Sequence, residues 1–415
     1  GHGDVSLVPL KAGQEKRPRV PKRPRVPSRI FCIKHGLFAI IALLIKLRVI
    51  RMKKTSVIVI TLVILLLVLS GCGKAPELVL TKYSDTFFGT FDTLTQVVGY
   101  NKSEQEFSEY FEKIRARFEE LHKLYDIYND YEGINNIKTI NENAGIKPVK
   151  VDKEIIDLIL FAKEWHAKTG GRTNIAMGAV LSIWHDYRER GEGDPVNAEL
   201  PPLEKLREAS NHTDINKIIV DEANSTVFLA DKEMRLDVGA IAKGYATELV
   251  AKEIMSEGFT SGIISPGGNI RVLGKPLDGM REYWGIGIQD PDKMFIAAEE
   301  NLLDTIFVNN AAIVSSGDYQ RYYVVEGKIY HHLIDPDTLM PGEYYRAVTI
   351  VTEDAGLADF LSTTAFLLPY DKSRKLVESL DNVEAVWVMP DGKVEATDGM
   401  KKLMKSHGAT GSKAE

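Results

Sequence analysis

A carboxylate and a hydroxyl lie four residues apart in the last fifth of the 415-residue chain, at Asp359 and Thr363. Residues at this spacing share one face of a helix, so both oxygens would point the same way. Two hard oxygen ligands suit Mg²⁺ that holds a phosphate better than they suit zinc. Chemistry alone favours equally a second interpretation, in which Asp359 only interacts with the dipole of a helix N-terminus and Thr363 only packs.

Two adjacent histidines, His331 and His332, precede Asp335 at the end of a strand-like run. Histidine suits proton transfer near neutral pH, and the carboxylate of Asp335 could orient a neighbouring group. A shared zinc site is disfavoured, because adjacent side chains in a strand point to opposite faces. We therefore expect one histidine to face a site and the other to be exposed.

A turn of small residues over 236–246 joins a strand-like run to a helical pattern in the middle of the chain. Gly239 and Gly244 would allow another group to approach the backbone closely, and amides at a helix start can bind an anion such as phosphate. Tight packing alone is the commoner reason for such a turn. A second small-residue turn, over 315–323, could form a substrate wall or simply the end of a hairpin.

Several common enzyme classes lack their signatures in this sequence. It has no Walker motif, no complete G-x-G-x-x-G that opens a helix after a strand, and no G-x-S-x-G elbow, which disfavours ordinary kinases, Rossmann enzymes and hydrolases. Apart from Cys32, the only cysteine is Cys72. The chain beyond it therefore has neither a disulfide framework nor a cysteine nucleophile.

Strands outnumber helices among the elements that must position these groups, and the two alternate irregularly. Helical patterns cover 104–124, 152–169 and 241–255, and strand-like patterns cover 83–98 with a break at Gly89, 217–220, 226–230, 262–272, 284–291 and 311–318. A loop over 126–132 carries tyrosines that could stack on a flat ring, and we expect 189–202 to be a flexible excursion. The pattern predicts an α+β fold with a large, mostly antiparallel sheet and packed helices.

The first seventy residues contain a predicted signal for export. Met52 and two lysines precede an apolar run over 57–69, which indicates a secretory signal, and 69–72 resembles a bacterial lipobox that would leave Cys72 lipidated. The alternative is a transmembrane anchor that is never cut, although the run is short for a span. We expect the following division: 1–51 a translated leader outside the native protein, 52–71 a lipoprotein signal peptide, 72–85 a lipidated tether, 86–400 the functional domain, and 401–415 a flexible tail.

Removal of the signal would leave an acidic protein. Residues 1–71 hold 14 of the 52 Lys/Arg and 2 of the 58 Asp/Glu, so 38 basic and 56 acidic residues remain, a formal net charge of −18. Sequence-independent binding to nucleic acid is therefore not expected.

Seven short motifs occur in an order that resembles the ApbE-type FAD:protein FMN transferase family. They cover 88–91, 174–178, 237–246, 267–269, 315–319, 332–336 and 358–363, within a matching region of about 86–397. The resemblance implies a T-fold-related architecture and an exported, often lipid-anchored enzyme. It also implies the reaction: FAD is split at its pyrophosphate, FMN is joined through its phosphate to a Thr or Ser hydroxyl of an exported acceptor flavoprotein, and AMP leaves.

The resemblance also assigns roles to individual residues. It implies that Asp359 and Thr363 bind Mg²⁺ together with the backbone carbonyl of Ala240, and that His332 is the general base for the acceptor hydroxyl. The remaining candidates would bind FAD, and they are Phe88, Tyr128, Asp237, Lys243, Gly267, Gly268, Asn269 and Asp335. Tyr128 would be the flat surface against the flavin ring. Asp237 and Lys243 would lie around the nucleotide, and Asp237 is also a catalytic candidate.

Two positions depart from the family pattern. Leu339 stands where a glycine is usual, so that turn cannot use glycine's freedom at positive φ, and Phe88 stands where methionine is common. In the tail, residues 408–410 resemble a flavin acceptor site at Thr410. Chance similarity in a disordered end is the favoured interpretation, because His407 replaces the expected hydroxyl residue.

Two rival functions share many of these residues. An FAD pyrophosphatase that releases free FMN and AMP would need the same metal ligands. A non-catalytic flavin-binding lipoprotein would depend on neither Asp359 nor Thr363.

Overall fold

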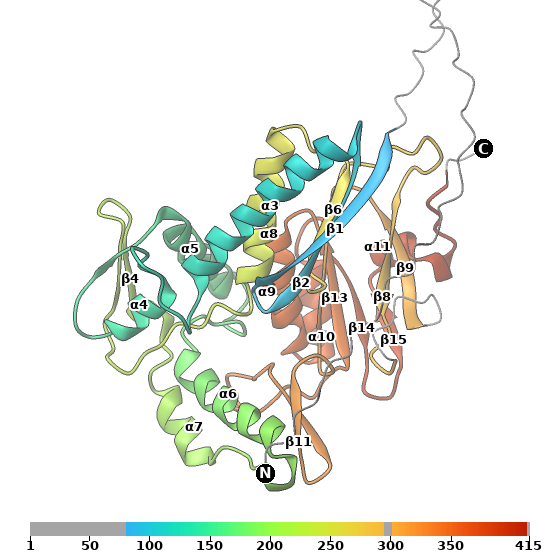
Figure 1. The fold of residues 1–415 in the computed structure, drawn as a ribbon. Coiled ribbons are helices and arrows are strands. Elements are labelled where there is room, and N and C mark those ends of the chain that lie inside the picture. Colours follow the sequence, from blue (N-terminus) through green and yellow to red (C-terminus); the bar gives the residue numbers. More distant parts are fainter. Residues whose placement is uncertain (1–79, 294–300, 413–415) are drawn as a thin grey trace, which may run out of the picture. The chain divides into compact units, whose positions relative to one another are not determined.

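The computed structural model describes residues 80–293 and 301–412 (Figure 1). The leader, the signal segment and the lipobox cysteine Cys72 lie outside the described residues, so those predictions remain predictions. Within the described ranges, no helix combines the length and the apolar character needed to cross a membrane.

An eight-stranded antiparallel sheet forms the centre of the fold, with the strand order β1-β2-β6-β7-β10-β13-β14-β15. The strands are β1 (Thr81–Thr90), β2 (Thr93–Asn101), β6 (Gly262–Pro266), β7 (Ile270–Leu273), β10 (Ala312–Gly317), β13 (Ala347–Thr352), β14 (Glu384–Val388) and β15 (Val394–Ala396). Neighbours along the chain pair as hairpins at β1–β2, β6–β7 and β14–β15, whereas the antiparallel pair β13–β14 is connected through two helices. The predicted α+β class with a mostly antiparallel sheet is confirmed.

The first hairpin turns later than expected. Strand β1 runs through Gly89, and the chain reverses at Phe91 and Asp92, which both adopt a φ of 52°. Two consecutive residues in the left-handed region match the twist of a tight antiparallel hairpin, although this region is costly for a bulky side chain such as phenylalanine.

Helices cover one face of this sheet: α3 (Glu104–Tyr125), α8 (Ala242–Ser256), α9 (Ala355–Phe366) and α10 (Tyr370–Glu378) (Figure 1). The helix predicted over 104–124 is confirmed as α3, and its apolar residues from Phe107 to Leu124 are buried at steps of three and four. Its start is capped by Ser103, whose side chain accepts a hydrogen bond from the Glu106 amide. Each fully buried side chain of this kind contributes about 1.5–3 kcal/mol.

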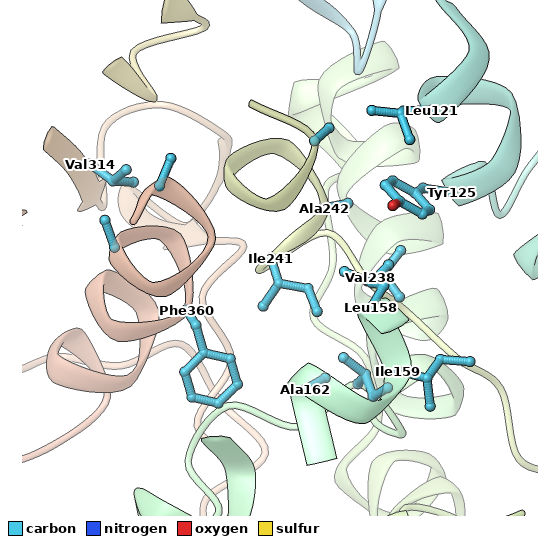
Figure 2. Packing of buried hydrophobic residues seen from close by; sticks show 14 of the residues in the cluster. Leu121, Tyr125, Leu158, Ile159, Ala162, Val238, Ile241, Ala242, Val314 and Phe360 are labelled. Carbon is cyan, nitrogen blue, oxygen red and sulfur yellow. The ribbon is translucent and has the colours of Figure 1, made fainter. Parts of the chain in front are cut away.

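The central turn is packed into this core from several sides. Its side chains Val238 and Ile241 are buried among residues of α3, α5 (Lys153–Lys168) and α9, including Leu158 and Phe360 (Figure 2). Dense packing of this kind fixes the backbone of a turn, because a well-packed interior leaves little room for shifts.

A second apolar cluster covers the opposite face of the sheet. It contains residues of β8 (Trp284–Gln289), β9 (Leu302–Val308) and α11 (Asp398–Leu403), and the 3₁₀ turn η4 (Lys405–His407) follows its member Met404. The tail also packs here: Met404 is buried, the Glu282 amide donates to the Gly411 carbonyl at 2.8 Å, and Ser412 forms an isolated antiparallel β-bridge with Arg281. The prediction of a flexible tail from residue 401 is therefore wrong as far as Ser412.

Two smaller groups of elements complete the fold. A three-stranded sheet, β3-β5-β4, lies with α4 and the turn η2; its elements are β3 (Val149–Lys150), β5 (Thr226–Leu229), β4 (Ile218–Asp221), α4 (Ile137–Glu142) and η2 (Ile215–Lys217). The other group shares a third apolar cluster and comprises α6 (Gly178–Gly193), η1 (Pro195–Asn197), α7 (Leu203–Ser210), β11 (Tyr322–Val325) and β12 (Lys328–His331). Residues 189–202 were expected to form a flexible excursion. In the structure they form the end of α6, then η1 and the segment that leads to α7.

Candidate active site

A cavity of about 620 Å³ brings together segments that are far apart in the sequence. Its wall comes from the end of α3, the loop after it, α6, the central turn, the β6–β7 turn, β10, the base of the β11–β12 hairpin, and α9. Nine of the residues proposed from the sequence line it: Tyr128, Asp237, Ala240, Lys243, Gly267, Asn269, His332, Asp359 and Thr363.

The central turn binds a carboxylate of the protein itself. The Gly244 amide, in the first turn of α8, donates to Asp359 Oδ2 at 2.8 Å. A Cβ atom at position 244 would lie 2.2 Å from the Ala355 carbonyl oxygen and 2.4 Å from Asp359 Cβ. Glycine is therefore required for α8 and α9 to approach so closely, and the predicted anion at this helix start includes the carboxylate of Asp359.

Asp359 and Lys243 both line the cavity and interact electrostatically. Burial raises the pKa of Asp359, while the positive charge of Lys243 opposes that rise. Burial lowers the pKa of Lys243, and the negative charge of Asp359 opposes that change. Asn269 Nδ2 is buried beside the Asp359 carboxylate, which it approaches without meeting the geometry of a full hydrogen bond. A buried amide donor that is not fully used suits a ligand that carries anionic oxygens.

The oxygen atoms around Asp359 suit a hard cation. Asp359 and Thr363 are one turn apart on α9, both are buried, and Ala240 lies on the wall of the same cavity. In the described residues, no group of three or more His, Cys, Asp or Glu side chains could hold a metal. One carboxylate, one hydroxyl and one carbonyl leave positions for phosphate oxygens and water, which is the usual coordination of Mg²⁺.

The two histidines have different surroundings. His331 is 6% exposed, and its ring nitrogens are used by the Gly342 carbonyl and the Leu333 amide at 2.8 and 3.2 Å. The expectation that one histidine would be exposed is wrong, because this ring packs edge-on against Phe366 in the core.

His332 faces the cavity. Burial, followed by the positive charge of Arg321, lowers the pKa of His332 to about 3, so the imidazole is neutral at pH 7. Its Nδ1 lies 3.3 Å from the Arg321 carbonyl. A carbonyl only accepts, so this contact assigns the ring proton to Nδ1 and leaves Nε2 as a free base.

Three of the proposed residues are not brought to the cavity wall. Phe88 is 76% exposed on β1, and Phe91 lines the cavity in its place. Gly268 lies in the β6–β7 turn at a φ of 90°, beside its lining neighbour Gly267. Asp335 is buried behind the wall.

Asp335 instead acts on an arginine that lines the cavity. Its Oδ1 accepts from the Asp337 and Thr338 amides and lies 3.4 Å from Arg172 Nη1. We expected Asp335 to orient a neighbouring group, and in the structure its neighbour is Arg172. In the same turn, Leu339 itself adopts a φ of 61°. This conformation costs a leucine roughly 1–2 kcal/mol, which its burial offsets.

Cavity residues that were not singled out from the sequence include His122, Arg172, His185 and Arg188. Phe91 and Asp126 also line the cavity and lie in segments that the sequence singled out, although neither residue was given a role. Ser316 and Arg321 lie in the 315–323 turn, for which a substrate wall was one of the two interpretations. His185 and Arg188 are three residues apart on α6, and Trp184 precedes Arg188 by four, so these side chains share one face of the helix. That periodicity was a usable signal, whereas the convergence of the others depends on the tertiary fold.

Comparisons with known proteins agree with this geometry. Residues 89–387 match the ApbE family. The chain is 31% identical over 276 residues to an FAD:protein FMN transferase of Treponema pallidum, covering 64% of this chain and 73% of that protein. It is 29% identical over 279 residues to one of Klebsiella pneumoniae, covering 67% and 82%.

Solved structures show the same fold. The ApbE protein of Thermotoga maritima superposes with a TM-score of 0.68 at 28% identity, covering 78% of this chain and 99% of that protein. The flavin transferase ApbE of Vibrio cholerae does so with a TM-score of 0.62 at 20% identity, covering 78% and 100%. At that lower identity, the likeness extends to the fold alone.

Proposed function

The chain belongs to the ApbE family, and we propose on this basis that it is an FAD:protein FMN transferase that uses Mg²⁺ to move FMN from FAD to a Thr or Ser hydroxyl of an exported protein, with release of AMP. One observation carries the proposal. Asp359 and Thr363 on α9, Lys243 on α8 and the neutral base His332 converge on a single cavity although they come from separate parts of the chain.

The part of the cavity around Asp359 would hold the pyrophosphate. Asp359, Thr363 and the Ala240 carbonyl would hold Mg²⁺, which neutralises phosphate charge when bound. Lys243 supplies a second positive charge, and the Asn269 amide can donate to a phosphate oxygen. Fixed groups of this kind stabilise developing charge without reorganising, which is the main requirement of phosphoryl transfer.

The chemical step is a displacement at phosphorus. The acceptor oxygen forms a bond to the phosphorus of the FMN half, and the bond from that phosphorus to the bridging oxygen breaks. AMP leaves with the bridging oxygen, and the hydroxyl proton passes to Nε2 of His332. A base with a low pKa accepts a proton weakly in the ground state, so its contribution depends on the acidity that the hydroxyl gains during attack.

The part of the cavity around Tyr128 suits the flavin. Tyr128 lines it with a ring that is 54% exposed and that stacks at a tilt on His185, with centroids 5.2 Å apart. An aromatic face of this kind can stack on the isoalloxazine ring. Arg172, Arg188 and Arg321 add positive charge around the wall.

The second candidate function is FAD hydrolysis, in which water replaces the acceptor hydroxyl and free FMN and AMP are released. The groups that line the cavity would serve water as well as an acceptor hydroxyl. To separate the two, the chain from Gly73 onward is mixed with FAD, Mg²⁺ and a candidate acceptor protein. Flavin fluorescence that stays on the denatured acceptor supports transfer, free FMN with unlabelled acceptor supports hydrolysis, and unchanged FAD refutes both.

We also propose that the protein is exported and held at the outer face of the cytoplasmic membrane by a lipidated Cys72. The signal-like sequence of 52–71 and the lipobox-like residues 69–72 support this. Feeding cells an alkyne fatty acid should label the native protein and leave the Cys72→Ala variant unlabelled. Equal labelling of both would refute the anchor.

A further inference from the structure

We propose that Asp126 is a positioning residue for FAD binding: its carboxylate holds the turn that presents the Tyr128 ring to the cavity. The inference rests on the proposed function, in which Tyr128 lies against the flavin. Asp126 directly follows α3, at the point where the chain leaves the helix and enters the loop that carries Tyr128.

Both carboxylate oxygens of Asp126 are fully engaged. Oδ1 accepts from the Tyr128 amide at 2.6 Å and the Asn129 amide at 3.1 Å. Oδ2 accepts from Asn129 Nδ2 at 2.9 Å and the Tyr131 hydroxyl at 2.7 Å. Four donors from three residues of the loop therefore point at one side chain, and two of the four are the backbone amides of Tyr128 and Asn129.

The state of this carboxylate excludes a role in proton transfer. Burial by itself would raise the pKa of Asp126, but the hydrogen bonds from Asn129, Tyr131 and the Tyr128 amide outweigh it and lower the pKa. An ionised carboxylate with all its acceptor positions used is neither a good base nor a free ligand. Its remaining function is to fix the loop.

The same network reaches a second part of the cavity wall, at Phe91. The Tyr131 hydroxyl that donates to Asp126 lies 3.5 Å from His122 Nε2, and His122 Nδ1 accepts from the Phe91 amide at 3.3 Å. Phe91 is the strained residue of the β1–β2 turn, and its ring packs on His122 with centroids 5.5 Å apart. Residues at the end of α3 thus hold two separate parts of the cavity wall: His122 contacts Phe91, and Asp126 holds the loop that includes Tyr128.

The chain contains a matched control for this motif. Asp221 and Asn224 repeat the spacing of Asp126 and Asn129: the Asn224 amide donates to Asp221 Oδ1 at 3.0 Å and its Nδ2 donates to Oδ2 at 2.7 Å. This second turn joins β4 to β5 and does not line the cavity. The same substitution at 221 therefore removes the same kind of turn without touching the site.

The test measures FAD binding and transfer in Asp126→Asn, Asp126→Ser and Asp221→Asn. Binding is followed by titration with FAD in EDTA, where no turnover occurs. Loss of one charge-assisted interaction, about 1.4 kcal/mol, corresponds to about a tenfold weaker affinity. We expect Asp126→Asn to raise both Kd and KM for FAD about tenfold, to leave kcat at saturating FAD within about twofold, and to increase the fluorescence of bound flavin as stacking is lost.

Asp126→Ser keeps a hydroxyl that can accept the backbone amides, so it should fold if Asp126→Asn does not and should lie between wild type and Asp126→Asn in affinity. Tyr128→Ala should weaken FAD binding, and adding Asp126→Asn to it should produce no further loss, because a residue that acts only through Tyr128 has nothing left to position. Asp221→Asn should match wild type in Kd, KM and kcat.

The outcomes separate this inference from the proposed function. Wild type that fails to bind FAD overturns both. Wild type that binds and transfers, with additive losses in the double variant or with an unchanged Kd in Asp126→Asn and Asp126→Ser, overturns the positioning role alone. A fall in kcat at unchanged KM also overturns it, because it would place Asp126 among the reacting groups.

Discussion

The close approach of α8 and α9 at Gly244 gives the most direct test of how the site is built. In Gly244→Ala, the new Cβ would lie 2.2 Å from the Ala355 carbonyl oxygen and 2.4 Å from Asp359 Cβ, whereas ordinary contact begins at 3.4 Å. Neither atom can rotate away, because one belongs to the backbone and the other is itself a Cβ. The two helices must separate, and the hydrogen bond from the Gly244 amide to Asp359 lengthens.

The expected magnitude combines opposing terms. Overpacking of this kind costs about 1–3 kcal/mol, and the upper end applies where the backbone must move. The better helix propensity of alanine returns about 1 kcal/mol, which leaves a net loss of about 2 kcal/mol and a fall in Tm of about 3 °C. A displacement of Asp359 by about 1 Å should reduce kcat/KM for FMN transfer about 100-fold.

The assay compares thermal unfolding and FMN transfer for Gly244→Ala and for Gly193→Ala. Gly193 lies at the exposed end of α6, and a Cβ there would have no atom within 4 Å. The control should keep both Tm and transfer. If Gly244→Ala keeps both as well, the reasoning that glycine holds Asp359 in place is wrong.

Three further predictions concern single residues. Asp359→Asn should lower the rate of FMN transfer at least about 100-fold, since it removes a charged metal ligand, and a higher Mg²⁺ concentration should restore part of that rate. Recovery of the rate in buffer that contains EDTA and no added Mg²⁺ would contradict this. His332→Gln should lower kcat about 100-fold or more. Because the folded pKa of His332 is depressed to about 3 from 6.5, its contribution to stability is present above pH 6.5 and declines as pH falls toward 3; a His332→Gln variant should lose that part of the acid dependence in urea unfolding. Leu339→Gly should be about 1 kcal/mol less destabilising than Leu339→Ala, since only glycine relieves the φ of 61°, and the reverse order in urea unfolding would rule out strain at this residue.

Local patterns in the sequence determined most of the elements. The helix now seen at α3 follows from apolar residues at three- and four-residue steps, and α5 ends at the predicted pair of glycines, with Thr169 as its cap. Hairpins at β6–β7 and strands at β8 and β10 also lie where alternating or apolar runs placed them. These signals are local, because hydrophobic period and turn residues act over a few positions.

The residue types of the candidate site could be predicted from the sequence, but their contacts could not. Asp359, Thr363, His332 and Lys243 could be named from the sequence because each carries a side chain suited to one step of the chemistry. Their order in the chain matched a known family.

What only the tertiary structure decided is which groups meet. Gly244 binds Asp359 across 115 positions of sequence, and Asp335 holds Arg172 across 163. The sequence could not show that Phe88 would point to solvent while Phe91 faced the cavity, because a β-bulge between Phe87 and Thr90 shifts the register of that hairpin. Contacts between distant segments depend on how whole elements pack, and that packing is fixed by the core as a unit rather than by any short stretch of residues.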